Sequence, residues 1–126
     1  MSKPFFSIII PTYNHAKFLK KALHSVYEQK FKNFEVIVID NHSIDNTFKV
    51  VNSFKNIIYK KIKNKGVIGK SRNIGINLSK GKWLAFLDSD DYWSKNKLQI
   101  AFRLIKEKKF DLICHSEWIL NQQTSK

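Results

Sequence analysis

Five short apolar runs recur along this chain, and they constrain its fold more than any other feature. β-Branched, aliphatic and aromatic residues dominate each run, and near-continuous apolar runs of this length are typical of strands buried on both faces of a sheet. The runs are FFSIII (5–10), EVIVID (35–40), NIIYKK (56–61), KWLAFL (82–87) and FDLICH (110–115). We therefore predict a strand at each of these five positions.

The segments between the runs carry the periodicity of amphipathic helices. Residues 17–29 and 98–106 place apolar side chains three or four positions apart, and residues 45–54 and 70–79 show weaker versions of the same pattern. Ser94 is the expected N-cap of the last helix. The apolar face of the first helix is expected to comprise Phe18, Leu19, Ala22, Leu23 and Val26.

Strands that alternate with helices predict an α/β domain with an open, mostly parallel sheet and helices on both faces. The length of 126 residues suits one such domain, and no repeat or Pro/Gly-rich linker divides it. In open sheets of this kind, ligands bind outside the carboxyl ends of the strands. The loops that follow the strands are therefore where we expect the chemistry.

The chain is strongly basic. It holds 23 Lys and Arg residues against 10 Asp and Glu residues, which gives a formal net charge of +13. This charge is compatible with an anionic partner and equally with a solvated lysine-rich surface. The lysines are scattered and the aromatic residues fall mainly within apolar runs, which disfavours nucleic-acid binding. Peripheral contact with an anionic membrane stays open.

The sequence indicates a cytoplasmic protein. Cys114 is its single cysteine, which excludes an internal disulfide framework and fits a reducing compartment. The apolar run near the N-terminus is too short for a signal peptide, and no stretch reaches the roughly 18 apolar residues of a membrane span.

The loop after the first predicted strand reads PTYNH. Pro11 is expected to end the strand, Tyr13 offers an aromatic face on which a nucleobase can stack, and Asn14 can cap the next helix. The same residues are also ordinary punctuation between a strand and a helix.

The loop after the second predicted strand reads IDNHSID. Asp40 stands at the end of a buried strand, where a carboxylate can accept a hydrogen bond from a nucleobase N–H or a ribose hydroxyl. An Asx-turn is the competing interpretation of Asp40. Ser43 or Asp45 is expected to cap the next helix rather than to contact a ligand.

Three acidic residues, Asp88, Asp90 and Asp91, cluster in the segment LDSDDYW after the fourth run. Clustered carboxylates repel one another, and a bound divalent cation removes that cost. Mg²⁺ or Mn²⁺ is typically held by one or two carboxylates, with water and phosphate oxygens in the remaining positions. We therefore favour metal–diphosphate binding at Asp88 and Asp90. The alternative is a polar turn that starts a helix, a role that stays open for Asp91.

A basic segment, KNKGVIGKSRNIG, lies between the third and fourth predicted strands. Lys70 and Arg72 put positive charge near the start of a helix, a setting that suits an anion. The glycine spacing is not that of a phosphate-binding loop, and a lysine-rich surface turn is the alternative.

Taken together, these motifs carry a family resemblance. The segments SIIIPTYNHAKFLKKALHSVYEQKFKNFEVIVIDNHSIDNT and GVIGKSRNIGINLSKGKWLAFLDSDDYW resemble the nucleotide-binding half of the family 2 glycosyltransferases, which have the GT-A fold. The resemblance implies transfer of a sugar from a nucleoside diphosphate donor, with a UDP-sugar favoured, usually with inversion and aided by Mn²⁺ or Mg²⁺. It also implies a glycan or lipid-linked acceptor in bacterial cell-surface polysaccharide or lipooligosaccharide synthesis.

The resemblance implies a site, position by position. The nucleotide-sugar-binding residues would be Pro11, Thr12, Tyr13, Asp40, Asn41, Arg72, Asp88 and Ser89, and the metal ligands would be Asp90 and Asp88. Asp40 would face the base, Arg72 would reach the base or the phosphates, and Asp90 would be the direct metal ligand. Many family members have a second acid where this chain has Asn41, which leaves the identity of the nucleotide undetermined.

An inverting displacement also needs a general base near the acceptor hydroxyl, and family members supply it from the second half of the domain. Asp111, His115 and Glu117 are the later groups that can take a proton, and none is expected to be that base; Asp111 is expected to open the last strand. We therefore expect residues 1–126 to form a single donor-binding domain, truncated at its C-terminus and without the base. The alternative is a non-catalytic nucleotide-sugar-binding fragment or subunit.

Overall fold

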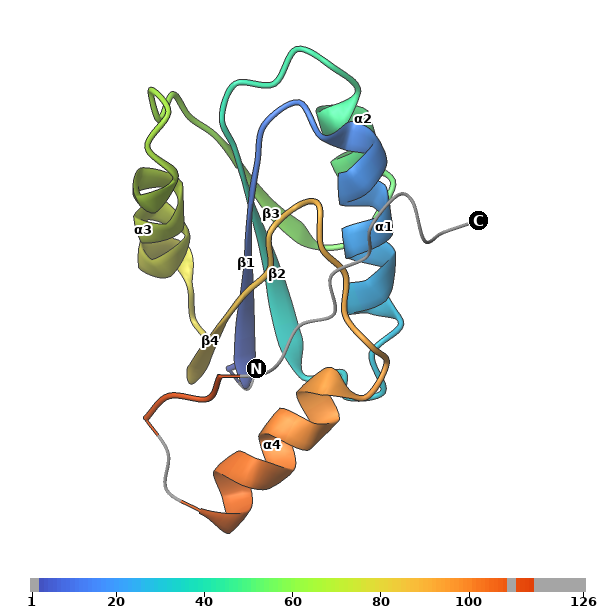
Figure 1. Ribbon diagram of the computed structural model, residues 1–126, viewed down its shortest axis with the longest axis vertical. Helices are drawn as coiled ribbons and strands as arrows, with labels where there is room; N and C mark the ends of the chain where they lie inside the picture. Colours follow the sequence, from blue (N-terminus) through green and yellow to red (C-terminus); the bar gives the residue numbers. More distant parts are fainter. Residues whose placement is uncertain (1–2, 109–110, 115–126) are drawn as a thin grey trace, which may run out of the picture.

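Strands and helices alternate along the chain, as the sequence predicts (Figure 1). The computed structural model describes residues 3–108 and 111–114. Its elements are β1 (Phe6–Thr12), α1 (Ala16–Tyr27), β2 (Phe34–Asp40), α2 (Thr47–Asn52), β3 (Ile57–Lys61), α3 (Ile68–Leu78), β4 (Trp83–Phe86) and α4 (Lys97–Glu107).

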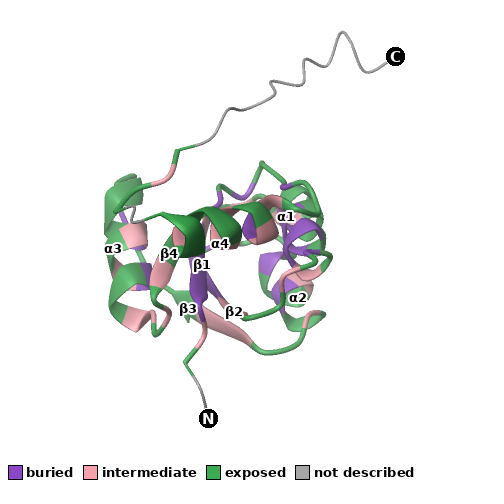
Figure 2. Cartoon of the chain, turned by 90° about the horizontal axis from the view of Figure 1, so that it is seen from below, coloured by how far each residue is buried: buried purple, intermediate pink, exposed green. Residues whose placement is uncertain are grey.

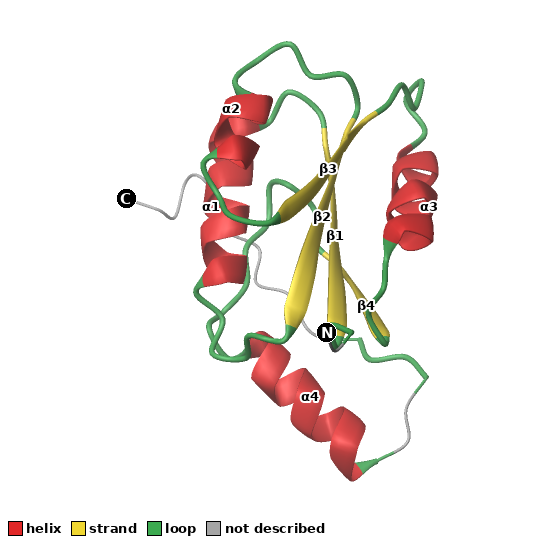
Figure 3. Ribbon diagram, turned by 180° about the vertical axis from the view of Figure 1, so that it is seen from behind, coloured by secondary structure: helices red, strands yellow, loops and turns green. Residues whose placement is uncertain are grey.

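The strands form one open sheet in the order β3-β2-β1-β4, and every neighbouring pair is parallel. Helices α1 and α2 cover one face and α3 covers the other, whereas α4 lies near the amino ends of the strands (Figures 1 and 3). The predicted open, parallel sheet with helices on both faces is therefore confirmed. Because all strands are parallel, their carboxyl ends meet at one edge, which carries the loops after β1, β2 and β4.

The two central strands are buried on both faces, as Figure 2 shows for β1. Successive side chains of a strand point to opposite faces, and the two hydrophobic clusters follow this alternation. On one face, Ile8 and Val36 belong to the larger cluster with the apolar side chains of α1, α2 and α4. On the other face, Ile9 and Ile37 pack with Ile74 of α3. The apolar runs of β1 and β2 therefore have the physical origin that the sequence predicts. The prediction of burial on both faces is wrong for β3 and β4, which are only partly buried because they lie at the edges of the sheet.

The predicted apolar face of α1 is confirmed except at Phe18. Leu19, Leu23 and Val26 are fully buried, whereas the side chain of Phe18 is 51% exposed. Phe18 lies in the first helical turn, at the edge of the buried stripe, and its ring contacts that of His15.

Some predicted boundaries are wrong. Ser94 is not the N-cap of α4, a position that Asn96 occupies; the carbonyl of Ser94 instead accepts hydrogen bonds from the amide of Lys97 and the side chain of Gln29. Helix α2 is shorter than predicted, and α3 begins earlier, at Ile68. In the part of the chain that the structure describes, no helix is long and apolar enough to cross a membrane.

The predicted strand at 110–115 is also wrong for the residues that the structure describes, since 111–114 form no strand. Asp111 is exposed and opens no strand there. His115 and Glu117 lie outside the described residues. An apolar run of this length predicts a strand only where a neighbouring strand is present to pair with it.

Gly75 allows α3 to approach β1, and this contact generates a stability prediction. A Cβ atom at Gly75 would lie 2.5 Å from Cγ2 of the fully buried Ile9. We expect Gly75→Ala to lower the free energy of unfolding by about 1–3 kcal/mol, because the added methyl group overpacks this contact. Gly69→Ala in the same helix is the matched control, since a Cβ there meets nothing within 4 Å. Urea-denaturation midpoints measure both effects, and equal midpoints would contradict the close packing.

Candidate functional site

The carboxyl edge of the sheet brings together most of the residues that the sequence singles out. Thr12 and Asp40, the last residues of β1 and β2, are partners in the strand register. Their exposed fractions are 5% and 1%. A hydroxyl and a carboxylate therefore lie side by side on adjacent strands, on the face that α1 and α2 cover.

The carboxylate of Asp40 is held by three hydrogen bonds. Its Oδ1 accepts from both the amide and the hydroxyl of Ser43, and its Oδ2 accepts from the hydroxyl of Tyr59 on β3. A buried carboxylate needs such partners because its desolvation is costly. The bonds from Ser43 close a local turn, which is compatible with the structural interpretation of Asp40. Since a carboxylate has about four acceptor sites, one site on Oδ2 has no partner among the contacts that the structure describes.

The hydroxyl of Thr12 has no hydrogen-bond partner in the described residues, although its oxygen is buried. A buried hydroxyl without a partner costs about 1–3 kcal/mol. A ligand at this edge would supply the missing bond. This orphaned group lies beside Asp40 in the strand register and is compatible with a ligand at this edge.

Pro11 does not end β1, contrary to the prediction, because β1 continues to Thr12. Odd-numbered residues of β1 bond toward β4, and the last of these contacts is from the amide of Leu87 to the carbonyl of Ile9. Pro11 lies beyond that point, so its missing N–H leaves no ladder bond broken. Tyr13 follows with its side chain 55% exposed, which leaves its ring available for stacking.

Asn14 does not cap α1, because it contacts the loop after β2 instead. Its backbone N–H donates to the hydroxyl of Ser43 at 2.9 Å, and its side-chain oxygen accepts from the backbone N–H of Ile44 at 2.9 Å. Asn14 adopts a left-handed conformation with φ of 47°, which asparagine tolerates better than most residues. The loops after β1 and β2 are thereby joined.

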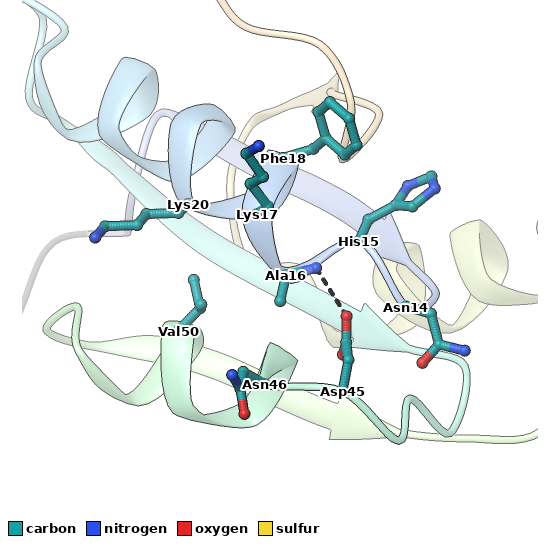
Figure 4. Close-up of a pocket in the computed structure, with 9 residues that line it drawn as sticks. All are labelled: Asn14, His15, Ala16, Lys17, Phe18, Lys20, Asp45, Asn46 and Val50. Carbon is teal, nitrogen blue, oxygen red and sulfur yellow. Dashed lines mark hydrogen bonds between the residues drawn. The ribbon is translucent and has the colours of Figure 1, made fainter.

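Asp45 serves the start of two helices, as Figure 4 shows for one of them. Its Oδ2 accepts from the amide of Ala16, the first residue of α1, and its Oδ1 accepts from the amide of Thr47, the first residue of α2. Burial alone would raise the pKa of Asp45, but these hydrogen bonds outweigh it and the pKa is lowered. The prediction that Asp45 has a capping role rather than a ligand role agrees with these contacts, although Asn46 occupies the N-cap position itself.

The acidic segment after β4 forms a turn at the same edge. The amide of Asp91 donates to the carbonyl of Asp88 at 3.0 Å, and α4 begins only at Lys97, so Asp91 does not start a helix. Ser89 is buried, and its hydroxyl lies 3.1 Å from Nδ1 of His15, in the loop after β1. This contact joins the acidic turn to the first loop.

Arg72 contacts Asp88 directly. Its Nη2 lies 3.0 Å from Oδ1 of Asp88, and the two side chains are 40% and 50% exposed. An ion pair as exposed as this contributes about 1 kcal/mol or less, so it can rearrange at little cost when a charged ligand arrives. The ion pair therefore brings the basic segment of α3 against the acidic turn.

Buried contacts from Ser25 of α1 and from Gln29, which follows α1, hold the chain after the acidic turn. The side chain of Gln29 is fully buried and donates to the carbonyls of Ser25 and Ser94, while its oxygen accepts from the amide of Leu98. The amide of Trp93 donates to the hydroxyl of Ser25 at 3.1 Å. The sequence analysis does not single out Gln29. The one available signal is its position as a polar residue at the end of an amphipathic segment.

Asn41 positions a neighbouring loop. Its side-chain oxygen accepts from the amide of the buried Asn64 at 2.9 Å. The side chain of Asn64 in turn contacts Ser71 and the amide of Gly66, which has φ of 81°. Asn41 therefore shapes the basic segment before α3, a role that the sequence does not reveal.

A hollow of about 290 Å³ lies beside the acidic turn. Its lining residues are Lys17, Phe18, Lys21, Asp90, Asp91 and Tyr92. The ammonium of Lys21 lies 4.1 Å from the centre of the Tyr92 ring. The exposed carboxylate of Asp90 therefore borders open space that is partly lined by positive charge.

Asp88 and Asp90 fit the ligand set of a hard divalent cation. Both are exposed carboxylates on one turn, and Ser89 between them is held in place by His15. The described residues contain no group of three or more His, Cys, Asp or Glu side chains placed to hold a metal ion. Two carboxylates suit Mg²⁺ or Mn²⁺, which keep several positions for water and substrate phosphates.

An open parallel sheet whose carboxyl edge gathers polar side chains defines a doubly wound α/β domain, a class in which ligands bind at that edge. The sequence matches the profile of the family described as Glycosyl transferase family 2 over residues 7–121. The chain therefore belongs to this family, as the motifs predict.

Two relatives illustrate the similarity. The chain is 37% identical over 114 residues to the Staphylococcus aureus poly(ribitol-phosphate) beta-N-acetylglucosaminyltransferase TarS, an alignment that covers 86% of this chain and 20% of TarS. It is 37% identical over 106 residues to the Escherichia coli UDP-Glc:alpha-D-GlcNAc-diphosphoundecaprenol beta-1,3-glucosyltransferase WfaP, covering 82% of this chain and 42% of WfaP. The chain thus spans less than half the length of either relative.

Solved structures show the same fold. The crystal structure of S. aureus TarS residues 1–349 in complex with UDP superposes with a TM-score of 0.79 at 37% identity, covering 82% of this chain and 32% of that one. The Pyrobaculum calidifontis mannosyltransferase PcManGT in complex with GDP-Man and Mn²⁺ superposes with a TM-score of 0.69 at 24% identity, covering 82% and 32% of the two chains, and shows the fold alone. The predicted GT-A fold is confirmed.

The hydrogen bond from Tyr59 to Asp40 predicts a pH dependence of stability. Burial, and then the hydrogen bond to Asp40 and its charge, raise the pKa of Tyr59 above its usual value of 10.0. A phenol whose pKa is raised on folding contributes its stabilisation fully below about pH 10 and loses it as the pH rises further. We expect Tyr59→Phe to lower the free energy of unfolding by about 1–3 kcal/mol at pH 7. The difference from wild type should shrink above about pH 10 in urea denaturation. A difference that is constant from neutral to alkaline pH would contradict this assignment.

Proposed function

We propose that this chain forms the donor-binding part of a glycosyltransferase that moves a sugar from a nucleoside diphosphate sugar to an acceptor. The observation that carries the proposal is the edge that holds Thr12 and Asp40 together with the acidic turn of Asp88 and Asp90. The first pair suits a nucleoside and the second suits a metal-bound diphosphate. The two parts of such a donor therefore have matching groups at one edge of the sheet.

The pair Thr12 and Asp40 favours a base with a ring N–H beside a carbonyl. The remaining acceptor site of Asp40 can take the N–H, and the unpartnered hydroxyl of Thr12 can donate to the carbonyl. Uracil has such an edge at N3–H and O4, and guanine has one at N1–H and O6, whereas cytosine has none. Tyr13 can stack on the base. We favour a UDP-sugar, which the UDP complex of the similar TarS structure supports.

The acidic turn would hold the metal and, through it, the diphosphate. Asp90 would be the direct ligand, with Asp88 beside it. A bound Mn²⁺ or Mg²⁺ would supply positive charge where negative charge grows on the departing diphosphate. Arg72 would meet the base or the phosphates, a role that its exposed ion pair with Asp88 supports.

For the acceptor we propose a glycan or lipid-linked molecule in bacterial cell-surface polysaccharide or lipooligosaccharide synthesis. The names of both relatives specify acceptors that carry phosphate and transfer that yields a β linkage. Because UDP-glucose and UDP-GlcNAc carry α-linked sugars, a β product supports inversion. We propose cytoplasmic action with peripheral contact at an anionic membrane, a contact that the net charge of +13 would favour.

Calorimetric titration with UDP, with and without Mn²⁺, tests the proposed function. We expect Mn²⁺ to strengthen UDP binding about tenfold or more, corresponding to at least about 1.4 kcal/mol, because it links the diphosphate to the carboxylates. Asp90→Ala should abolish this gain. Asp91→Ala, the same change at the adjacent acid, is the matched control and should retain it.

Two results would contradict the proposal: no binding of UDP or GDP, or UDP binding that neither Mn²⁺ nor Asp90→Ala alters. Transfer of the sugar by this chain alone would contradict the separate expectation that its general base lies elsewhere.

A further inference from the structure

We propose that Tyr59 is a positioning residue that determines which nucleobase the site accepts, through the orientation in which it holds Asp40. The inference rests on the proposed donor site and deepens it. Tyr59 is outside the motifs of the sequence, and its strand, β3, is an edge strand of the sheet.

The contacts around Asp40 restrict its carboxylate on both oxygens. Oδ1 carries two hydrogen bonds from Ser43, and Oδ2 carries the one from the Tyr59 hydroxyl. Tyr59 is the register partner of Val38, two residues before Asp40, so its ring lies on the same face of the sheet and its hydroxyl reaches the strand end. Rotation of the carboxylate would break bonds on both of its oxygens.

In this restricted orientation, the carboxylate has one hydrogen-bond acceptor site without a partner among the described residues. A fixed acceptor beside the Thr12 hydroxyl matches a ring N–H with a carbonyl next to it, and it opposes the N3 acceptor of cytosine. A site that leaves buried polar groups unpaired with the wrong ligand discriminates strongly against that ligand. Without the Tyr59 hydroxyl, Oδ2 would gain a second free acceptor site and the carboxylate could turn toward the amino group of cytosine. Tyr59 thus acts on selectivity through Asp40 without touching the base.

Tyr59→Phe removes this hydroxyl and keeps the ring, which lies 5.3 Å from the ring of Phe48. Tyr27→Phe is a matched control for the loss of one hydrogen-bonded tyrosine hydroxyl. The hydroxyl of Tyr27 donates to the carbonyl of Lys55 at 2.6 Å, and its ring packs against the same hydrophobic cluster as that of Tyr59. Tyr27 ends α1, away from the carboxyl edge.

The test compares the affinities of UDP and CDP for wild type, both Tyr→Phe variants and Asp40→Asn at saturating Mg²⁺, with the diphosphate common to both ligands. We expect wild type to prefer UDP by about tenfold or more, and Tyr59→Phe to reduce that preference about five- to tenfold. Tyr27→Phe should keep the wild-type ratio, and Asp40→Asn should weaken UDP binding and remove the preference. The ratio of UDP to CDP affinity is informative because a general loss of stability would weaken the binding of both ligands alike.

One outcome would overturn the role of Tyr59 and leave the donor site intact. In that outcome, Tyr59→Phe and Tyr27→Phe show the same ratio of UDP to CDP affinity, while Asp40→Asn loses the preference for UDP. UDP binding without preference, or unaffected by Asp40→Asn, would overturn both this role and the assignment of Asp40 to the base. If Tyr59→Phe does not fold, Ser43→Ala replaces it, since it removes one of the two bonds to Oδ1. Ser43→Ala should also lower the ratio of UDP to CDP affinity, and an unchanged ratio would overturn the premise that restraint of the Asp40 carboxylate sets the base preference.

Discussion

The burial of β1 and β2 on both faces is the constraint on which the rest of the structure depends. Apolar side chains such as Ile8 and Ile9 point to opposite faces, so each face must be covered by a helix. Covering both faces with connections that return the chain to the same end makes every strand parallel. Parallel strands end at one edge, and this is why loops distant in the sequence meet there.

The same burial makes the edge suitable for binding. The carboxylate of Asp40 is tolerated because Ser43 and Tyr59 satisfy it, and these partners also fix its direction. Hydrogen bonds also join the loops around Asp40. The hydroxyl of Ser43 accepts from the backbone N–H of Asn14, and the neighbouring His15 hydrogen-bonds to Ser89 within the acidic turn. Groups held in this way do not need to be reoriented when a ligand binds, which lowers the entropic cost of binding.

The sequence predicts the parallel sheet, and edge residues such as Asp40 and Asp88, because both follow from local patterns: apolar runs for the strands, and polar residues where those runs end. Thr12, Asn41 and Ser89 are implied only by the family resemblance. It does not predict contacts that depend on which strands become neighbours. The bond from Tyr59 to Asp40 and the burial of Gln29 require the folded arrangement. The errors at Ser94 and 110–115 have the same cause, because tertiary partners decide where a helix starts and whether an apolar run pairs as a strand.

The most direct test of the central claim is an NMR titration of the ¹⁵N-labelled protein with UDP and Mg²⁺, which shows which backbone amide signals change. If the donor lies on the carboxyl edge, the changes will concentrate in the loops at residues 12–15, 40–45 and 87–91. The surface of α4, near the amino ends of the strands, will then serve as the internal reference and stay unchanged. Changes confined to α4 or to the turn at residues 30–33, with none in the three loops, would contradict the account.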